Sequence, residues 1–364
     1  MTPRTISLAA RLQRWAPRVA WLIVCLVVAL VLCRPAGSVA AQREPPPAEP
    51  PSLLPTFQVL GRDQGLAHPI VRSILRDRRG FMWFGTNAGL NRYDGYRLTG
   101  FTAEDTPSGP GVVIVAALAE DHDGVLWVGT VGAGLAAYDP RTGIFTRVQF
   151  DPQVGTSDVE IRSLLVDRGG TLWVGNIGGG LSRRDPTTGT FTHYRHDPTD
   201  PNSLSSDSVL TMIEDRDGAL WIGTLEGGLD RFDPATGRFT HYRHDEADPA
   251  SLSSGRVQTV FEDRAGILWV GTNGGGLNAL DRKTGQFTHY RHDPRDAGSL
   301  SNDNVSALHQ DRSGSLWIGT LGGGLNRFDP ATRVFAAYRH DPAVPVSLSA
   351  DNVGEIYEDA SGLL

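Results

Sequence analysis

The sequence predicts an all-β fold, namely a β-propeller of four-stranded blades. The first observation behind this prediction is a tryptophan that returns in the same sequence context every 44–48 residues. The second is that the residues between tryptophans divide into four short apolar segments with turns between them. A repeat of this length is typical of propellers and related arrays, and four strands fill one propeller blade. No segment after residue 57 has a convincing helical period.

The recurring tryptophans define the repeats. They are separated by 44, 46, 48, 48 and 48 residues, at Trp83, Trp127, Trp173, Trp221, Trp269 and Trp317. In one repeat the four predicted strands are 209–214, 220–224, 229–233 and 239–244. The turns between them read Asp-Arg-x-Gly, a Gly-rich turn and Asp-Pro-x-Thr-Gly, and glycine suits turn positions with positive φ. The simplest role for the repeated tryptophan is packing between neighbouring blades.

The strand register predicts six complete blades and parts of a seventh. Residues 56–60 resemble a fourth strand, so the propeller begins with the last strand of a blade. Residues 352–359 resemble a first strand, and the next tryptophan of the series would fall at position 365. We therefore expect the chain to stop inside a repeat, without the two middle strands of the seventh blade, and to be a fragment of a longer protein.

The N-terminus has the pattern of an export signal. Residues 1–18 contain four arginines and no acid, 19–33 are uninterruptedly apolar, and small residues follow at 37–41. The 15-residue apolar run is short for a membrane-spanning helix, which needs about 20 residues. We expect an apolar helix within a signal peptide or signal anchor (1–41), a Pro-rich linker (42–55) and the propeller (56–364). Whether the signal is cleaved or kept as an anchor stays open.

Composition excludes several functions. The only cysteines, Cys25 and Cys33, lie in the export segment, which excludes a disulfide scaffold, a zinc–thiolate site and cysteine catalysis in the propeller. The net charge is −7, and removal of the five arginines in the first 40 residues would make it −12. An acidic exported protein is a poor nucleic-acid binder, so we expect no nucleic-acid partner.

Two sequence units carry a family resemblance. Residues 311–320 (DRSGSLWIGT) and 323–329 (GGLNRFD) closely resemble two-component regulator propeller repeats, and 77–86 (DRRGFMWFGT) resembles the usual first repeat of that family. The resemblance extends over about residues 57–364. In that family the repeats form the exported sensor region of histidine kinases, often hybrids, and a second propeller, an immunoglobulin-like module, a membrane helix and the kinase usually follow. Some members have other outputs, such as diguanylate cyclases.

The resemblance implies a sensor role without catalysis in this chain. The implied ligand is a small molecule or a glycan, and the implied partner is a downstream kinase region in the parent protein. The implied location is the periplasmic or extracellular side of the membrane, with membrane attachment in the parent. The resemblance also allows a dimer in the parent protein. Two alternatives stay open: a secreted propeller that serves as a protein-interaction scaffold, and a propeller enzyme that acts on polysaccharides.

Several motifs that suggest chemistry fit the scaffold better. In each of three His-x-x-His pairs an offset of three places the side chains on opposite faces of a strand, which disfavours a shared metal. These pairs are His193/His196, His241/His244 and His289/His292. The acids Asp197/Asp200 and Asp293/Asp296 fit turn capping rather than calcium binding. The Gly-rich segment 271–276 precedes no helix, so it lacks the helix N-terminus of a phosphate loop. We expect no metal, cofactor or catalytic residue.

Ligand contacts are expected where the repeats differ from one another. In a propeller the turns between the second and third strands share one face with the connectors between blades. The Asp-Arg-x-Gly and Asp-Pro-x-Thr-Gly turns share the other face. Within the Gly-rich turns, three variable positions near the expected channel mouth are polar: Asn87, Glu226 and Asn273. We predict these residues as candidate ligand contacts.

Overall fold

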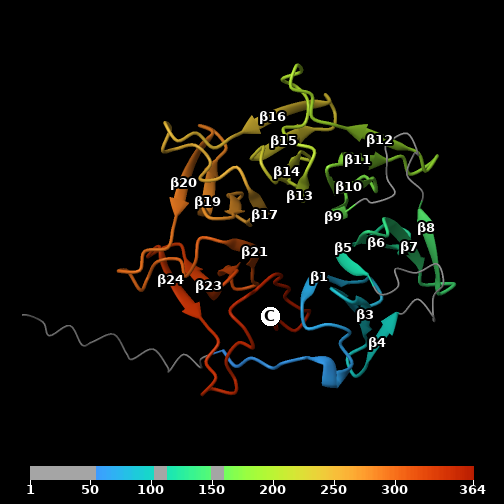
Figure 1. The fold of residues 1–364 in the computed structure, drawn as a ribbon, viewed down its shortest axis with the longest axis horizontal. Helices are drawn as coiled ribbons and strands as arrows, with labels where there is room; N and C mark the ends of the chain where they lie inside the picture. The colour runs from blue at the N-terminus through green and yellow to red at the C-terminus, as the bar shows by residue number, and fades with distance from the viewer. Residues whose placement is uncertain (1–54, 102–112, 149–159) are drawn as a thin grey trace, which may run out of the picture. The chain divides into compact units, whose positions relative to one another are not determined.

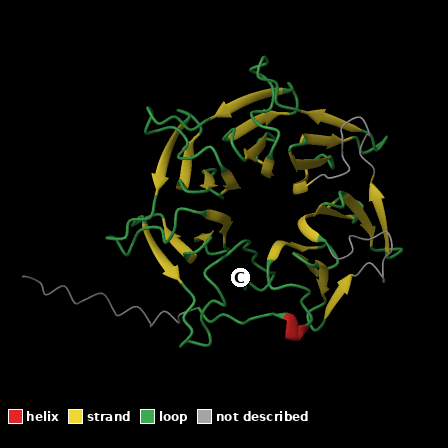
Figure 2. Ribbon diagram, viewed as in Figure 1, coloured by secondary structure: helices red, strands yellow, loops and turns green. Residues whose placement is uncertain are grey.

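The computed structural model describes residues 55–101, 113–148 and 160–364. They form antiparallel strands arranged in a ring, with a single 3-10 turn, η1 (Arg62–Gln64), among the described residues (Figures 1 and 2). The prediction of an all-β propeller is therefore confirmed. The predicted N-terminal apolar helix lies outside the described residues. No helix in the described part of the chain has the length and apolar character required to cross a membrane.

Six blades follow one another along the chain, and each consists of four consecutive strands. Blade 1 contains β1 (Val71–Arg76), β2 (Met82–Thr86), β3 (Gly89–Tyr93) and β4 (Leu98–Phe101). Blade 2 contains β5 (Ile114–Glu120), β6 (Leu126–Val131), β7 (Leu135–Asp139) and β8 (Ile144–Val148). Blade 3 contains β9 (Glu160–Val166), β10 (Leu172–Ile177), β11 (Gly180–Arg184) and β12 (Phe191–Tyr194).

The second half of the ring repeats this order. Blade 4 contains β13 (Val209–Glu214), β14 (Leu220–Thr224), β15 (Leu229–Asp233) and β16 (Arg238–Tyr242). Blade 5 contains β17 (Val257–Glu262), β18 (Leu268–Thr272), β19 (Gly276–Asp281) and β20 (Gln286–Tyr290). Blade 6 contains β21 (Val305–Gln310), β22 (Leu316–Thr320), β23 (Gly324–Asp329) and β24 (Val334–Tyr338). The first strand of every blade lies nearest the centre of the ring, and the fourth lies outside (Figure 1).

The blades differ from the prediction at two places. Blades 2 and 3 join into one eight-stranded sheet because Val131 at the end of β6 pairs with Glu160 at the start of β9. The predicted strands of a seventh blade, 56–60 and 352–359, are not assigned as strands: 352–359 makes one isolated bridge, Leu321 to Asn352. A strand needs a paired neighbour along its length, and neither segment has one among the described residues.

One carboxylate organises each repeat. In blade 4, Asp215 Oδ1 accepts the backbone N–H of Ala219 (2.9 Å), and its Oδ2 accepts the indole N–H of Trp221 (2.8 Å). The same pair of bonds occurs in all six blades, with Asp77, Asp121, Asp167, Asp215, Asp263 and Asp311. The repeated Asp-x-x-Gly turn is thus fixed to the tryptophan six residues after its aspartate.

The tryptophans pack between blades, as the sequence predicts. Trp83, Trp173 and Trp269 meet an aromatic ring on the third strand of the next blade edge-on, with ring centroids 5.4–5.7 Å apart. The partners are Tyr138, Phe232 and Phe328. Such contacts stabilise a core beyond the area they bury.

A glycine on the second strand permits this close packing. A Cβ on Gly223 would lie 2.6 Å from Val257 Cγ1 on the next blade and 2.6 Å from Thr211 Cγ2. We predict that Gly223→Ala lowers the free energy of unfolding by about 1–3 kcal/mol, because the added methyl group overpacks the inter-blade contact. Chemical denaturation of the purified chain measures this. The matched control is Gly100→Ala on the outer strand β4, where a Cβ meets Asn91 Nδ2 at an ordinary 3.6 Å. An equal loss in both variants contradicts the packing argument.

Candidate ligand-binding site

A β-bulge occurs at the same place in every innermost strand. The pairing register between the first two strands skips one residue, for example between Val71 and Ser73 and between Val257 and Thr259. The skipped residues are Arg72, Ala116, Arg162, Leu210, Gln258 and Ser306. Bulges redirect side chains and are frequent beside functional sites. The bulge is part of the scaffold, but the residue that occupies it changes from blade to blade.

The residue before each bulge is valine or isoleucine; it is half-buried in blade 1 (Val71) and fully buried in the other five blades. Val115, Ile161, Val209, Val257 and Val305 are fully buried, with 0% of their surface exposed. These branched apolar side chains pack between the blades and hold the start of each inner strand. We therefore assign the constant apolar residue to the scaffold. The variable bulged residue that follows it belongs to the candidate site at the centre of the ring.

Two of the bulged residues are arginines, Arg72 on blade 1 and Arg162 on blade 3, and each contacts a polar side chain near it. Arg72 is exposed, and its Nε donates to Asn87 Oδ1 at 2.8 Å. Arg162 Nη1 donates to Glu160 Oε1 at 3.2 Å. Burial and the guanidinium of Arg162 lower the pKa of Arg72, while the carboxylate of Glu160 opposes that shift.

The three predicted contact residues lie in turns of the same kind, between the second and third strands. Asn87 lies between β2 and β3, where its N–H donates to Ile70 O (3.2 Å). Glu226 is exposed between β14 and β15. Asn273 lies between β18 and β19, and its N–H donates to Arg256 O (3.0 Å). The structure brings Asn87 together with Arg72, whereas the described contacts do not join Glu226 or Asn273 to that pair.

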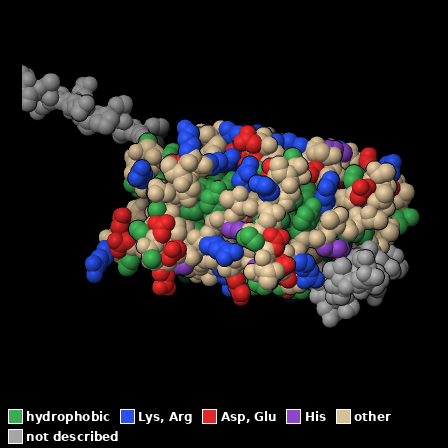
Figure 3. All heavy atoms as spheres, turned by 90° about the horizontal axis from the view of Figure 1, so that it is seen from above, with side chains coloured by type: hydrophobic (Ala, Val, Ile, Leu, Met, Phe, Trp, Pro, Cys, Tyr) green, Lys and Arg blue, Asp and Glu red, His purple; other side chains and the backbone are tan. Residues whose placement is uncertain are grey.

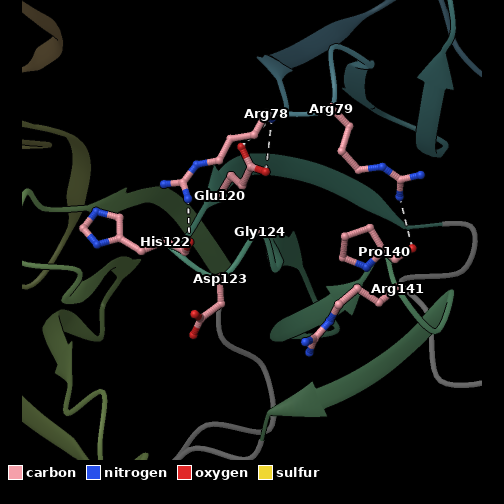
Figure 4. A pocket seen from close by; sticks show the side chains of 8 residues that line it. All are labelled: Arg78, Arg79, Glu120, His122, Asp123, Gly124, Pro140 and Arg141. Carbon is pink, nitrogen blue, oxygen red and sulfur yellow. Dashed lines mark hydrogen bonds between the residues drawn. The ribbon is translucent and has the colours of Figure 1, made fainter.

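A cavity of about 500 Å³ lies between blades 1 and 2, on the face that carries the Asp-Arg-x-Gly turns. Figure 4 shows Arg78 beside Glu120, whose carboxylate accepts the Arg78 N–H at 2.9 Å, and Arg79 donating to Pro140 O at 3.1 Å. Burial raises the pKa of Glu120, and the hydrogen bond from Arg78 N–H opposes this shift. The charged residues Arg78, Arg79 and Glu120, which line the cavity, are thus engaged in contacts within the protein.

The Arg78 contact is one copy of a repeated connection between blades. The arginine of one Asp-Arg-x-Gly turn donates to the inner strand of the next blade, as when Arg216 N–H and Nε donate to Glu262 at 2.8 and 2.7 Å. The equivalent residues are Arg78, Arg168, Arg216 and Arg264, and Arg312 donates in the same way to Glu358, which is not in a strand. The cavity in Figure 4 is therefore formed by scaffold residues, and we assign it no ligand.

The His-x-x-His pairs also belong to the scaffold. The second histidine of each pair places Nδ1 2.7–2.8 Å from a leucine carbonyl in the following connector. These histidines are His196, His244 and His292, and His340 makes the same contact. Across the described ranges 55–101, 113–148 and 160–364, no group of three or more His, Cys, Asp or Glu side chains is arranged to hold a metal ion.

Charges on the rim are mixed. Seen edge-on in Figure 3, the propeller carries basic and acidic side chains close to one another over the visible rim. No large patch of one sign appears on this side.

Comparison with known families agrees with the fold and the repeats. A family model described as "Two component regulator propeller" matches residues 65–88, 108–132, 203–226, 251–274 and 299–322. The third repeat, around Trp173, is not among the matched segments although it forms blade 3. Five of the six repeats therefore match the model of two-component regulator propeller repeats, and the resemblance seen in the sequence is confirmed. No curated protein matches the chain.

Solved structures extend the comparison. The extracellular domain assigned to the hybrid two component system BT3049 of B. thetaiotaomicron is 29% identical, with a TM-score of 0.70, over 85% of this chain and 40% of that domain. The corresponding domain of BT4673 from the same organism is 24% identical, with a TM-score of 0.68, over 85% and 38%. PorZ of Porphyromonas gingivalis shares the fold at 20% identity and a TM-score of 0.55, over 70% and 38%.

These matches relate the propeller to extracellular domains of two-component systems. The chain spans about two fifths of the two extracellular domains that it resembles. The family match and the BT3049 domain support a sensing domain rather than an enzyme, and the chain contains no kinase part.

Proposed function

We propose that the chain is the extracytoplasmic, ligand-sensing propeller of a two-component sensor whose histidine kinase is not part of this chain. The observation that carries the proposal is the contrast within the repeats. Six blades share their packing residues, while the bulged inner residues and the turns beside them differ. A ring of repeated scaffold with variable polar groups on one face is suited to recognising a specific ligand.

The comparisons support both the role and the location. Five of the repeats match a family model described as "Two component regulator propeller". The BT3049 structure, which is 29% identical to this chain, is an extracellular domain. The basic and apolar N-terminal segment has the pattern of an export signal. In this proposal the propeller lies outside the cytoplasm, in a parent protein attached to the membrane.

Signalling would follow from a ligand that prefers one of two arrangements of the sensor region. A ligand shifts such an equilibrium only as far as its affinities for the two arrangements differ. The propeller would supply this difference in affinity, and the downstream kinase region would respond to it, as a dimer if the parent dimerises. The ligand class in this proposal is a small molecule or a glycan.

Ligand screening with site variants tests the proposal. A thermal-shift screen of the purified chain against mono- and oligosaccharides and small metabolites should find a ligand that raises the melting temperature. We predict that Asn87→Ala, Glu226→Ala and Asn273→Ala each weaken binding of that ligand by roughly 3- to 10-fold, the loss of about one hydrogen bond.

The rim provides the matched control. Thr146→Ala on the outer strand β8 changes an exposed side chain far from the turns between second and third strands, and it should leave the affinity unchanged. If no compound in the screen binds, the sensor proposal fails. If Thr146→Ala weakens binding and the three turn variants do not, the face that we assign to the ligand is wrong.

A further inference from the structure

We propose that the connector between blades 4 and 5 and the turn beside it form a site for the carboxylate of an acidic sugar. The site consists of Arg243, His244, Gly255 and Arg256 in the connector and Glu226 in the turn between β14 and β15. The inference rests on the proposed function, because it names the chemical class of the sensed ligand and the blade that contacts it.

The first step of the argument is the place that an aspartate fills in other blades. In blade 3 the His196 N–H donates to Asp207 Oδ1 at 2.8 Å, and Arg195 Nη1 donates to Asp207 Oδ2 at 3.3 Å. The carboxylate lies beside the start of the third strand, where a Cβ on Gly180 would be 3.4 Å from Asp207 Oδ1. The same N–H bond occurs after blades 5 and 6, from His292 to Asp303 and from His340 to Asp351. The repeat thus surrounds one carboxylate with donors.

The second step is that blade 4 has no aspartate at this place. The residue equivalent to Asp207, one repeat later, is Gly255. The backbone keeps its path, since Gly255 O accepts the Gly228 N–H at 3.0 Å. The matching bond in blade 3 joins Asp207 O to the Gly180 N–H at 2.7 Å. A Cβ on Gly228 would lie 3.3 Å from Arg243 Cα, so the connector passes the same glycine. The surroundings of the carboxylate are therefore kept without the carboxylate.

The third step is the donors that remain. The Arg243 guanidinium and the His244 N–H correspond to the donors of blade 3, and neither has a hydrogen-bond acceptor among the described residues. Arg256 follows Gly255 directly, at a position that is serine or asparagine after blades 3, 5 and 6, and no protein acceptor for its guanidinium lies in the described part of the chain. Arg243, His244 and Arg256 are exposed, so a ligand can reach them. A guanidinium presents a planar fork that matches a carboxylate.

The fourth step is Glu226, whose position is glycine in three other blades. Those glycines have positive φ, whereas Glu226 does not: they are Gly178, Gly274 and Gly322. A Cβ on Gly255 would lie 2.9 Å from Glu226 O, so the turn approaches the connector closely. An aspartate at 255 would collide with this turn, which explains why both positions differ in the same blade. The exposed Glu226 carboxylate can accept a hydroxyl of a ligand.

The fifth step is the room for the rest of a sugar. A cavity of about 550 Å³ is lined by His244 together with Asp245, Glu246, His289 and Arg291. Carboxylates accept hydroxyl groups and a guanidinium donates to them, so this lining suits a ligand rich in hydroxyls. Because the lining carries acids as well as cations, it favours a sugar with a single carboxylate over a polyanion.

Binding of matched acidic and neutral probes tests the site. The probes are glucuronosyl-galactose, which has one carboxylate, and its neutral methyl ester, both measured by calorimetry with the full chain. We expect the acid to bind more tightly than the ester, and more weakly as salt rises. Arg243→Gln and Arg256→Asn should each weaken binding of the acid by roughly 10-fold, the loss of one charge-assisted contact.

Two further variants sharpen the result. The double variant Glu226→Gly/Gly255→Asp gives blade 4 the glycine and aspartate of blade 3, so the chain's own carboxylate should fill the site and abolish binding of the acid. Its melting temperature shows whether it folds. The matched control is Arg195→Gln, which removes the equivalent arginine of blade 3, where Asp207 already fills the place, and should leave the affinity unchanged.

Three outcomes overturn the inference. One is that the acid does not bind or binds no better than its methyl ester. Another is that Arg243→Gln leaves binding of the acid unchanged or weakens it no more than Arg195→Gln does. The third is that a folded Glu226→Gly/Gly255→Asp variant binds the acid as tightly as the original chain. Each of these leaves the sensor proposal standing if the wider screen finds another ligand, so the two failures are distinguishable.

Discussion

Replacement of Asp215 by alanine should lower the free energy of unfolding by about 3–5 kcal/mol, the range for removing one partner of a buried ion pair. The Asp215 carboxylate is 1% exposed and accepts four donors. Oδ1 accepts the N–H groups of Asp217 and Ala219 at 3.0 and 2.9 Å. Oδ2 accepts Trp221 Nε1 at 2.8 Å and Arg282 Nη1 at 3.3 Å. Alanine would leave a buried indole N–H without an acceptor and would deprive Arg282 of a partner.

The neighbouring Asp217 is the matched control. Its carboxylate is 73% exposed and lies 3.9 Å from Arg282 Nη1. Exposed ion pairs contribute about 0–1 kcal/mol, so Asp217→Ala should be close to neutral. Urea unfolding followed by tryptophan fluorescence measures both variants. Similar losses for the two aspartates would show that the turn, rather than the buried carboxylate, carries the stability.

The repeat made most of this scaffold predictable. Residues 209–214 and 220–224, read as strands from apolar alternation and turn residues, coincide with β13 and β14. The fourth strand ends at Tyr242, before the predicted residue 244, because His244 places Nδ1 2.7 Å from Leu252 O in the connector. The segment 352–359 could not be settled by pattern, because a strand is defined by its paired neighbour as well as by its own residues.

The candidate site was only partly predictable, for a physical reason. Variation among repeats identified Asn87, which contacts Arg72. Arg72 and Arg162 themselves look like ordinary polar residues of a strand in the sequence, since a bulge is a property of the pairing between two strands. The sequence contains one signal: the position directly after a constant branched apolar residue is arginine in two repeats and leucine in another. The place of these two residues on innermost strands depends on the whole ring, which no local pattern contains.

Blade 4 contains a buried ion pair that no other described blade repeats. Asp230 is fully buried, and its Oδ1 lies 2.7 Å from His241 Nδ1. His241 Nε2 lies 3.0 Å from Pro201 O, so both ring nitrogens face acceptors. An imidazole can donate from both nitrogens only when it is protonated, and the hydrogen bond to Asp230 raises the pKa of His241. At the equivalent cross-strand positions blade 6 has Asn326 paired with Ala337.

We expect His241→Ala to lower the free energy of unfolding by about 3–5 kcal/mol at pH 6, because it leaves the Asp230 carboxylate buried without its partner. The double variant Asp230→Asn/His241→Ala reproduces the pair of blade 6 and should recover most of that loss, since a neutral amide replaces the charge. Unfolding of these two variants, the single variant Asp230→Asn and the original chain in urea gives the coupling between the residues. A double variant as unstable as His241→Ala would contradict a charge-based explanation.

The same pair predicts a dependence on pH. Because the folded-state pKa of His241 is raised above the ordinary value of 6.5, its contribution to stability is complete below pH 6.5 and is lost as pH rises through the folded-state pKa. The original chain should therefore lose more stability between pH 6 and pH 9 than Asp230→Asn/His241→Ala, which has no histidine at this position. Urea unfolding at both pH values measures the difference. Equal losses in the two proteins would mean that His241 is not protonated in the folded state.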